Sequence, residues 1–441
     1  MCAGIFFVLL DVTIVNVALP AIGRGTGAPH LADLQWVVDA YQLTLAGLLL
    51  AGGTLGDRYG HKRIVTAGFI VFGLASAACA LSPGIGPLVA ARVVQGMGAA
   101  LLLPGTLAVI TRLYADREEQ ARAIGAWAAI GSLALPAGPV LGGLLVELAG
   151  WPWVFWINVP VIAAVVAVIL RMVEEDEPAP RRLDVPGVLL GTAMLALVTF
   201  AVIEAGRAGL GSWMVIVAAV AALAAGVAFV IVEHRREEPV LPLPLLRRRP
   251  IAVSTAVAAT MNFGINGVML LFTLYLQTVR DRTPIEAGLS LLPLFLPLVL
   301  LPAQAGKVAG RRGPAPVMLA GLALLVAGFA LLLPLRADSG FITLFAAMAV
   351  IGVGAALLTP SVVALAMGAA PDGREGLTSA LNNTARKAGG AVGVAALGAI
   401  AGDPARPPAF VSGIHHAAVV AAVAYCCAAV LTFTTSRMSA S

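Results

Sequence analysis

The sequence predicts an all-α integral membrane protein, and both its composition and its pattern indicate this fold class. Of the 441 residues, 60% are hydrophobic and 12% are charged, whereas an ordinary soluble domain is roughly 25% charged. Soluble cores stop growing near about 250–300 residues, so a chain this apolar needs lipid to cover its surface. The apolar residues also come in runs of about 20, the length at which a helix crosses about 30 Å of hydrocarbon.

The apolar runs predict fourteen transmembrane helices separated by short loops. They cover residues 3–22, 34–56, 63–81, 86–111, 122–146, 151–170, 185–205, 212–232, 251–277, 286–306, 315–333, 340–367, 377–401 and 414–435. The first run contains Asp11 and follows no basic leader, so we interpret it as a retained helix and not as a signal peptide. The two longest gaps, 171–184 and 233–250, leave no room for a soluble domain.

Basic residues predict how the helices are oriented. With a cytoplasmic N-terminus, nineteen of the 28 Lys and Arg residues fall in cytoplasmic loops or the C-terminal tail, and six fall outside. This excess predicts an even number of helices with both termini in the cytoplasm. The net charge of +5 is then explained by membrane orientation and not by a nucleic-acid partner. Only Arg92, Arg386 and Lys387 fall well inside predicted helices, away from their ends.

Two segments of the chain are repeated in its second half. The run GMGAALLLP at 96–104 returns as GVGAALLTP at 352–360, and GTLGDRYG at 53–60 returns as GKVAGRRG at 306–313. Because both copies run the same way through the membrane, they predict two six-helix bundles related by an axis along the membrane normal. We therefore expect an N-terminal bundle at residues 1–170, a linker at 171–250 with the two remaining helices, and a C-terminal bundle at 251–441.

The segment 53–63 joins the second and third predicted helices on the cytoplasmic side. Its glycines let two helix ends approach a tight turn, its aspartate can cap or pair with neighbouring helix ends, and its basic residues hold the turn at the anionic inner surface. An ordinary positive-inside loop is the alternative, and the repeat at 306–313 favours a conformational role. The candidate gating residues in this segment are Gly53, Asp57, Arg58, Gly60, Lys62 and Arg63.

These residues and Leu55 match the helix 2–3 motif of the major facilitator superfamily, G-x-L-x-D-R-x-G-x-(R/K)-(R/K). Three further segments resemble its fourteen-helix drug–proton antiporter branch: LDVTIVNVALP at 10–20, RVVQG at 92–96 and GPVLGG at 138–143. The resemblance spans nearly the whole chain. It implies the major facilitator fold with two extra central helices. The chain departs from the pattern in its short N-terminus, in Pro152 where Arg is more usual, and in Lys387 where Gln is frequent.

Asp11 lies in the middle of the first predicted helix, where a carboxylate costs about 2.5–3.5 kcal/mol on insertion scales. It is therefore a candidate to bind a proton from one side of the membrane and release it to the other. Arg92 stays charged and could tune a nearby carboxyl group, with Asp11 as the first candidate and Asp39 as the second. The alternatives are a structural Asp11 satisfied by hydrogen bonds, an Arg92 that binds backbone or Gln95, and an Asp39 at the membrane rim.

The fifth predicted helix carries the candidate conformational residues Gly138, Pro139, Gly142 and Gly143. The spacing of Gly138 and Gly142 lets helices pack closely, and Pro139 removes a backbone donor and is expected to bend the helix. A bendable and tightly packed helix suits rocking of one bundle against the other, although ordinary helix packing would require the same residues.

Polar side chains inside the helices are candidates for the substrate path, because in lipid they should face a cavity or partner helices. Asn262 and Asn266 share one helix face, and Asn382 and Arg386 repeat that spacing. Hydrogen bonding between helices would explain the Asn pair equally well. The complete set of substrate-path candidates is Asn16, Gln95, Asn262, Asn266, Asn382 and Arg386.

The resemblance implies a monomeric proton-coupled antiporter that exports small hydrophobic or amphipathic compounds across the bacterial cytoplasmic membrane by alternating access. A narrow-substrate exporter or a proton symporter would share these motifs. The absence of G-x-x-x-x-G-K-(S/T) speaks against nucleotide-driven transport, and the Cys and His residues show no metal or disulfide spacing, so no cofactor or metal is expected. An integral-membrane enzyme would need a reactive cluster at one membrane face, and the acidic run 174–177 is interpreted as a solvated linker.

Overall fold

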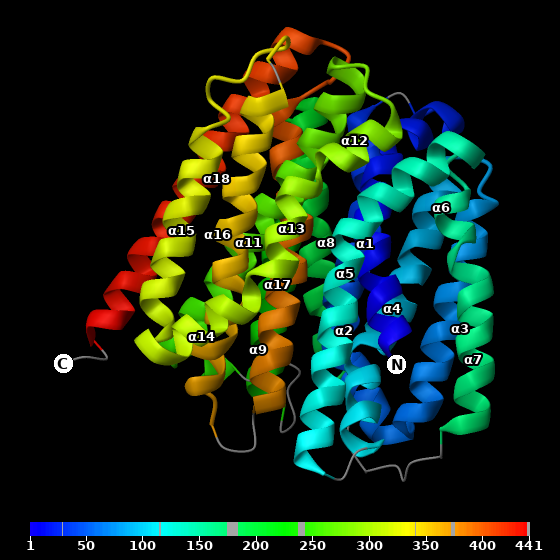
Figure 1. Ribbon diagram of the computed structural model, residues 1–441, viewed down its shortest axis with the longest axis vertical. Coiled ribbons are helices and arrows are strands. Elements are labelled where there is room, and N and C mark those ends of the chain that lie inside the picture. The colour runs from blue at the N-terminus through cyan, green and yellow to red at the C-terminus, as the bar shows by residue number, and fades with distance from the viewer. Residues whose placement is uncertain are drawn as a thin grey trace. The chain divides into compact units, whose positions relative to one another are not determined.

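The computed structural model describes residues 1–28, 30–113, 116–173, 184–236, 243–339, 341–371 and 375–438. Within these ranges the chain forms helices and no strand (Figure 1), as the composition predicted. Each predicted apolar run lies mainly on helix. The acidic run 174–177 lies outside the described residues.

The chain divides into two units, each of which is a bundle of helices. Unit 1 comprises Met1–Leu197, Val220–Val240 and Thr283–Leu289, and unit 2 comprises Val198–Ala219, Leu241–Arg282 and Ser290–Ser441. Residues of α8 (Val185–Ala208) and α9 (Trp213–Arg235) occur in both units. The division of the chain at 170 and 250 stays a prediction.

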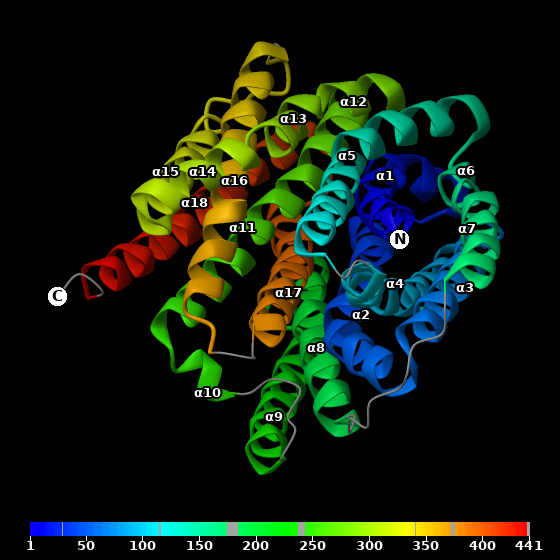
Figure 2. The same ribbon diagram turned by 60° about the horizontal axis from the view of Figure 1, so that its bottom comes forward.

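Unit 1 is built from the first seven helices together with α12. These are α1 (Cys2–Thr26), α2 (Leu31–Tyr59), α3 (His61–Ala80), α4 (Ile85–Leu113), α5 (Arg117–Ala149), α6 (Trp153–Trp156), α7 (Asn158–Met172) and α12 (Pro284–Ser290). Helix α1 packs against α2, α4, α5 and α6, so it is enclosed within the unit, as Figure 2 also shows. Side chains in the middle of α1 are therefore shielded from lipid and water.

Unit 2 contains the later helices. These are α10 (Leu243–Leu246), α11 (Arg249–Leu274), the π-helical turn η1 (Tyr275–Val279), α13 (Leu292–Leu300), α14 (Pro302–Arg312), α15 (Pro314–Ala330), α16 (Phe341–Gly368), α17 (Glu375–Ala401) and α18 (Pro407–Met438). Helix α11 packs along α17 and also contacts α16 and α18, which places α11 in the interior of this unit.

The described helices do not confirm the predicted count of fourteen spans. Ten of them are long and apolar enough to cross a membrane, and there are up to twelve if two bent pairs each count as one span. The bends lie within α2, by 52°, and between α13 and α14, by 51°. Helix α15 is a shorter apolar helix of 17 residues, and α17, which contains Arg386 and Lys387, is not among the spans.

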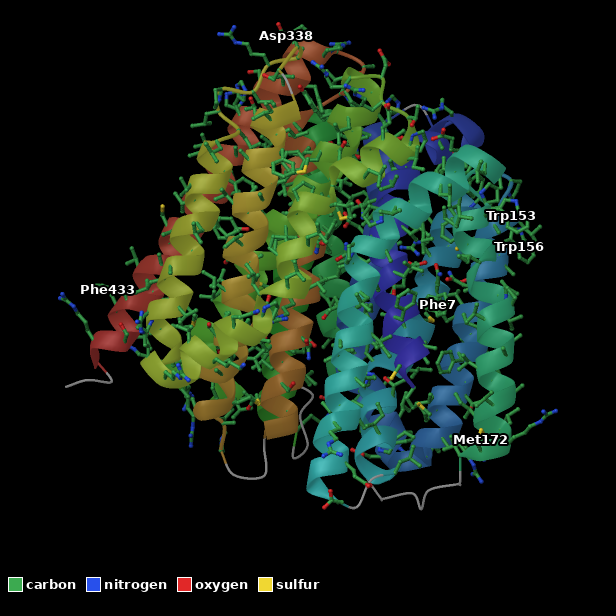
Figure 3. The ribbon with its side chains drawn as sticks, in the orientation of Figure 1. Phe7, Trp153, Trp156, Met172, Asp338 and Phe433 are labelled. Atoms are coloured by element: carbon green, nitrogen blue, oxygen red, sulfur yellow. The ribbon has the colours of Figure 1, made fainter. Side chains whose placement is uncertain are left out.

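Exposed apolar side chains show that the outer surface of the helices suits lipid. On α9, Val220, Leu223 and Val227 are 63%, 71% and 53% exposed, and water would disfavour so continuous an apolar face. In Figure 3 the exposed Trp153 lies with Trp156 towards one end of α7, and the exposed Met172 lies at its other end. Tryptophan is enriched where helices leave the hydrocarbon. The chain is a multi-pass membrane protein.

The two sequence repeats occupy equivalent positions in the two units. In unit 1, a Cβ at Gly53 would lie 3.7 Å from the Cβ of Pro104, and in unit 2 a Cβ at Gly306 would lie 3.8 Å from that of Pro360. The glycine pair Gly68–Gly98 of unit 1 is likewise equivalent to the pair Gly321–Gly354 of unit 2. In both pairs, a Cβ added to either glycine would lie 2.8–3.1 Å from the backbone oxygen of the other glycine. The predicted repeat therefore corresponds to the same packing of helices in each unit.

The segment 53–63 is helical at both ends and is not an extended loop. Helix α2 ends at Tyr59 and α3 begins at His61, so Gly60 alone makes the turn with φ 93° and ψ 132°. Gly313 makes the equivalent turn between α14 and α15 with φ 83° and ψ 157°. Because a side chain is strained at such positive φ values, both turns require glycine.

Candidate functional site

Asp11 and Arg92 form an ion pair in the interior of unit 1. Both residues are 0% exposed, and the Nη1 group of Arg92 on α4 donates to Oδ2 of Asp11 on α1. The first of the two partners expected for Arg92 is therefore the one observed. Because each charge neutralises the other, the pair can remain in an apolar interior that would reject either ion alone.

Gln95 completes the contact between these two charges. Its Oε1 accepts from Nη1 of Arg92 at 2.7 Å, and its Nε2 donates to Oδ1 of Asp11 at 2.8 Å. The amide thus presents its acceptor to the cation and its donor to the carboxylate, which is the orientation that satisfies both. Gln95 therefore forms a three-residue cluster with Asp11 and Arg92, and its place in the substrate path stays a prediction.

Two residues that the sequence analysis did not single out extend this cluster. Nε2 of Gln95 also donates to Oγ of Ser76 on α3 at 2.9 Å, and Nδ2 of Asn158 on α7 donates to the same oxygen at 3.3 Å. Ser76 and Asn158 are 0% and 1% exposed. A hydrogen-bonded network that includes Asp11 therefore connects four helices of unit 1.

Arg92 also contacts α2 directly. Its Nε donates to the backbone oxygen of Val37 at 2.8 Å, and its guanidinium lies 4.3 Å from the centre of the Tyr41 ring. A cation over an aromatic face is attracted electrostatically, and the Tyr41 hydroxyl donates to the oxygen of Val8 on α1 at 3.2 Å. The alternative roles expected for Arg92, bonds to backbone and to Gln95, are thus present together with the ion pair.

Asp39 is buried but does not join this cluster. It is 0% exposed, so it lies in the interior of unit 1, and the rim interpretation of this residue stays a prediction. Neither of its carboxyl oxygens has a hydrogen-bond partner among the described residues, and the same holds for both side-chain polar atoms of Gln42. Protonation of Asp39 would therefore break no ion pair, whereas protonation of Asp11 would remove the charge that balances Arg92.

Gly138 and Gly142 bring α5 into direct contact with α1. A Cβ at Gly138 would overlap Oγ1 of Thr13, and one at Gly142 would lie 2.9 Å from the oxygen of Ile14. Thr13 and Ile14 follow Asp11 by two and three residues along α1. Gly143 lies against the backbone of Pro284 on α12, and Pro139 is inside α5. A shift of α1 would therefore be transmitted to α5 through backbone contact.

Gly138→Val is expected to destabilise the protein by about 1–3 kcal/mol or more, because the added methyl groups overpack the α1–α5 contact. Gly125→Val is the matched control in the same helix, since a Cβ at Gly125 meets no atom within 4 Å. Thermal unfolding of the purified proteins in detergent measures the difference. Equal unfolding temperatures for the two variants would contradict this close-packing interpretation.

The turn after α2 contains a polar contact between Asp57 and His61. Oδ1 of Asp57 lies 3.2 Å from Nε2 of His61 at the start of α3, so Asp57 pairs with a neighbouring helix end as expected. Arg58 and Arg63 are exposed, and Lys62 is half-buried. The guanidinium of Arg58 lies 5.2 Å from the centre of the Tyr59 ring. The gating role of these residues stays a prediction.

Three of the Asn residues predicted for the substrate path make hydrogen bonds within one helix or between helices. Asn16 donates to Val12 oxygen at 2.7 Å, and Asn262 donates to Ala258 oxygen at 3.1 Å. Asn382 on α17 donates to Ser254 oxygen on α11 at 3.4 Å. Asn266 is half-buried. These contacts fit helix packing, and the role of the Asn residues in binding a substrate stays a prediction.

The chain matches the family model of the Major Facilitator Superfamily over residues 1–394. It is 37% identical over 398 residues to the multidrug resistance protein Stp of Mycobacterium tuberculosis, covering 90% of this chain and 74% of that protein. It is 34% identical to the methylenomycin A resistance protein of Streptomyces coelicolor, covering 91% and 84%. To the puromycin resistance protein pur8 of Streptomyces alboniger it is also 34% identical, covering 95% and 86%.

Solved structures of POT family transporters share the fold. An auto-inhibited peptide transporter of that family aligns with a TM-score of 0.71 at 14% identity, covering 98% of this chain and 95% of that chain. The transporter PepTSo aligns with a TM-score of 0.70 at 13% identity, covering 98% and 96%. At these identities the likeness concerns the fold alone. The chain belongs to the Major Facilitator Superfamily, as its motifs predicted.

Proposed function

We propose that this protein is a proton-coupled antiporter that exports small hydrophobic or amphipathic compounds from a bacterial cytoplasm. The observation that carries the proposal is the buried Asp11, a titratable carboxyl group bound by Arg92 and Gln95 in the interior of unit 1. The relatives named for resistance to methylenomycin A and puromycin support export of such compounds.

Proton binding at Asp11 supplies the coupling step. A protonated Asp11 is neutral, so it no longer neutralises Arg92, and the ion pair between α1 and α4 is lost. Arg92 keeps its bonds to Val37 and Gln95, and α1 is then free to move with α5 through Gly138 and Gly142. A substrate that binds only when Asp11 is deprotonated competes with the proton, so proton entry drives substrate exit.

A single chain in the cytoplasmic membrane, with both termini inside, opens alternately to the two sides of the membrane. The excess of basic residues on one side supports that orientation, and no nucleotide or other cofactor takes part because the proton gradient supplies the free energy. Protons, the bilayer and a small organic molecule are thus the partners. A proton symporter would use the same ion pair and differ only in which states of Asp11 bind the substrate.

Transport in proteoliposomes with an imposed pH gradient tests the proposed function. Substrate movement and internal pH are followed together for a panel of lipophilic dyes and antibiotics. An antiporter moves substrate and protons in opposite directions, and dissipating the gradient with an ionophore should stop uphill movement. Movement of substrate and protons in the same direction would show a symporter and contradict the proposal.

A further inference from the structure

Helix α17 contains two adjacent cationic residues at its midpoint. The helix has 27 residues, from Glu375 to Ala401, and Arg386 and Lys387 lie eleven and twelve residues from its first residue. With a rise of about 1.5 Å per residue, both lie roughly 16–18 Å from the nearer helix end. Both cations therefore lie far from either end of the helix, and charged side chains inside the helices of a membrane protein are costly and usually have a function.

No acidic side chain in the described membrane helices of unit 2 neutralises these two cations. Helices α11, α13, α14, α15, α16 and α18 contain no Asp or Glu. Glu204 on α8 is bound to Arg207 at 2.9 Å, and Glu375 is the first residue of α17. The other acidic residues described in unit 2, Asp281, Asp338 and Asp403, are exposed. Unit 1 differs, because its buried Arg92 is paired with Asp11.

The contacts of Arg386 satisfy only part of its guanidinium. Nη2 donates to the backbone oxygen of Thr359 on α16 at 3.2 Å, whereas the buried Nε has no partner among the described residues. A neutral carbonyl orients the side chain but does not neutralise its charge. Lys387 is half-buried, and its chain of four carbons lets its ammonium group reach beyond its own helix position. The pair thus has positive charge and a free N–H group available for a ligand.

We propose that Arg386 and Lys387 bind an anionic group of the transported compound, such as a sulfonate, a carboxylate or a phosphate. The inference rests on the proposed transport function and specifies its substrate class as amphipathic anions or zwitterions. Guanidinium groups recognise planar and tetrahedral oxyanions through parallel N–H bonds, and the ammonium group adds a second charge. The position at mid-helix favours a substrate over a lipid headgroup, because headgroups lie at the helix ends.

Binding of two matched aromatic probes to the purified protein tests this inference. Naphthalene-2-sulfonate is anionic and naphthalene-2-sulfonamide is a neutral molecule of similar shape, so the difference in their Kd isolates the charge. Wild-type protein in phosphatidylcholine nanodiscs is expected to bind the sulfonate roughly tenfold or more tightly than the sulfonamide, and Lys387→Gln and Arg386→Gln should each raise the sulfonate Kd roughly ten- to hundredfold. Lys387→Arg, which keeps the charge, should retain binding.

Lys307→Gln is the control, because Lys307 is an exposed lysine of the same unit in the middle of α14. Equal affinity for both probes, or an equal loss in Lys307→Gln, would overturn the inference. Loss of sulfonate binding when phosphatidylglycerol is added to the nanodiscs would show that the cations hold a lipid headgroup, and would also overturn it. Lys387→Gln gives an independent result if Arg386→Gln does not fold.

The same probes separate this inference from the proposed function. If the sulfonamide is exported against proton entry in proteoliposomes but the sulfonate does not bind, the anion site is wrong and the antiporter stands. If the sulfonate binds as expected but neither probe moves with proton counterflow, the anion site stands and the proposed function is wrong.

Discussion

Asp11→Asn is expected to abolish uphill, proton-driven export while leaving a protein that inserts and still exchanges substrate down its gradient. Asn keeps the shape of the side chain and an oxygen that accepts from Arg92, but it cannot take up a proton. The variant should therefore show at most a few per cent of the wild-type uphill rate, because coupling requires the protonated and deprotonated states in turn. Counterflow assays in proteoliposomes with and without a pH gradient measure both activities.

Asp33→Asn is the matched control for this change, since Asp33 lies in the first turn of α2 in the same unit and outside the Asp11 cluster. It should export like wild type. Asp39→Asn distinguishes the two buried carboxyl groups, because Asp39 has no partner among the described residues. Full uphill export by a normally inserted Asp11→Asn protein would contradict the role given to Asp11.

Arg92→Gln is expected to lower the free energy of unfolding by about 3–5 kcal/mol, because removing one partner of a buried ion pair leaves the other charge uncompensated. The variant also lacks the hydrogen bond from Arg92 to Val37 and the contact with the Tyr41 ring, and this lowers the free energy of unfolding further. The unfolding temperature of the purified variant in detergent should therefore fall well below that of wild type.

The double variant Asp11→Asn/Arg92→Gln separates the ion pair from those other contacts. If the two residues stabilise each other, the double variant should be about 1–3 kcal/mol more stable than the sum of the single effects predicts. Thermal unfolding of all four proteins under one condition gives this coupling free energy. Additive losses would show that the two side chains lie close together without stabilising each other.

The ion pair of Asp11 and Arg92 could be predicted from the sequence because lipid disfavours isolated charges. Two opposite charges inside apolar runs of the same bundle are expected to meet, and they do. The roles of Ser76 and Asn158 could not be predicted in this way, since a short neutral polar side chain in an apolar run most often forms a hydrogen bond to the backbone of its own helix. Tyr41 was missed because an aromatic residue in an apolar helix has the pattern of a core residue.

The repeat was predictable and the number of spans was not. The repeat is carried by glycine and proline, whose backbone effects are local, so Gly60 and Gly313 make equivalent turns. Span counting depends on hydrophobicity and assumes straight helices of similar length. Bends within α2 and between α13 and α14, and the short α15, violate this assumption. The helical form of the segment 53–63 was missed because a single positive-φ residue can reverse the chain without a loop.

Proton release on substrate binding tests the central claim most directly. Purified protein in weakly buffered detergent solution is mixed with a transported compound, and a pH indicator reports protons released at a pH where Asp11 is partly protonated. The wild-type protein is expected to release protons in an amount that grows with substrate saturation, and Asp11→Asn is expected to release none at equal substrate occupancy. Equal release from both proteins, or no release from wild type when substrate is bound, would contradict competition between proton and substrate at Asp11.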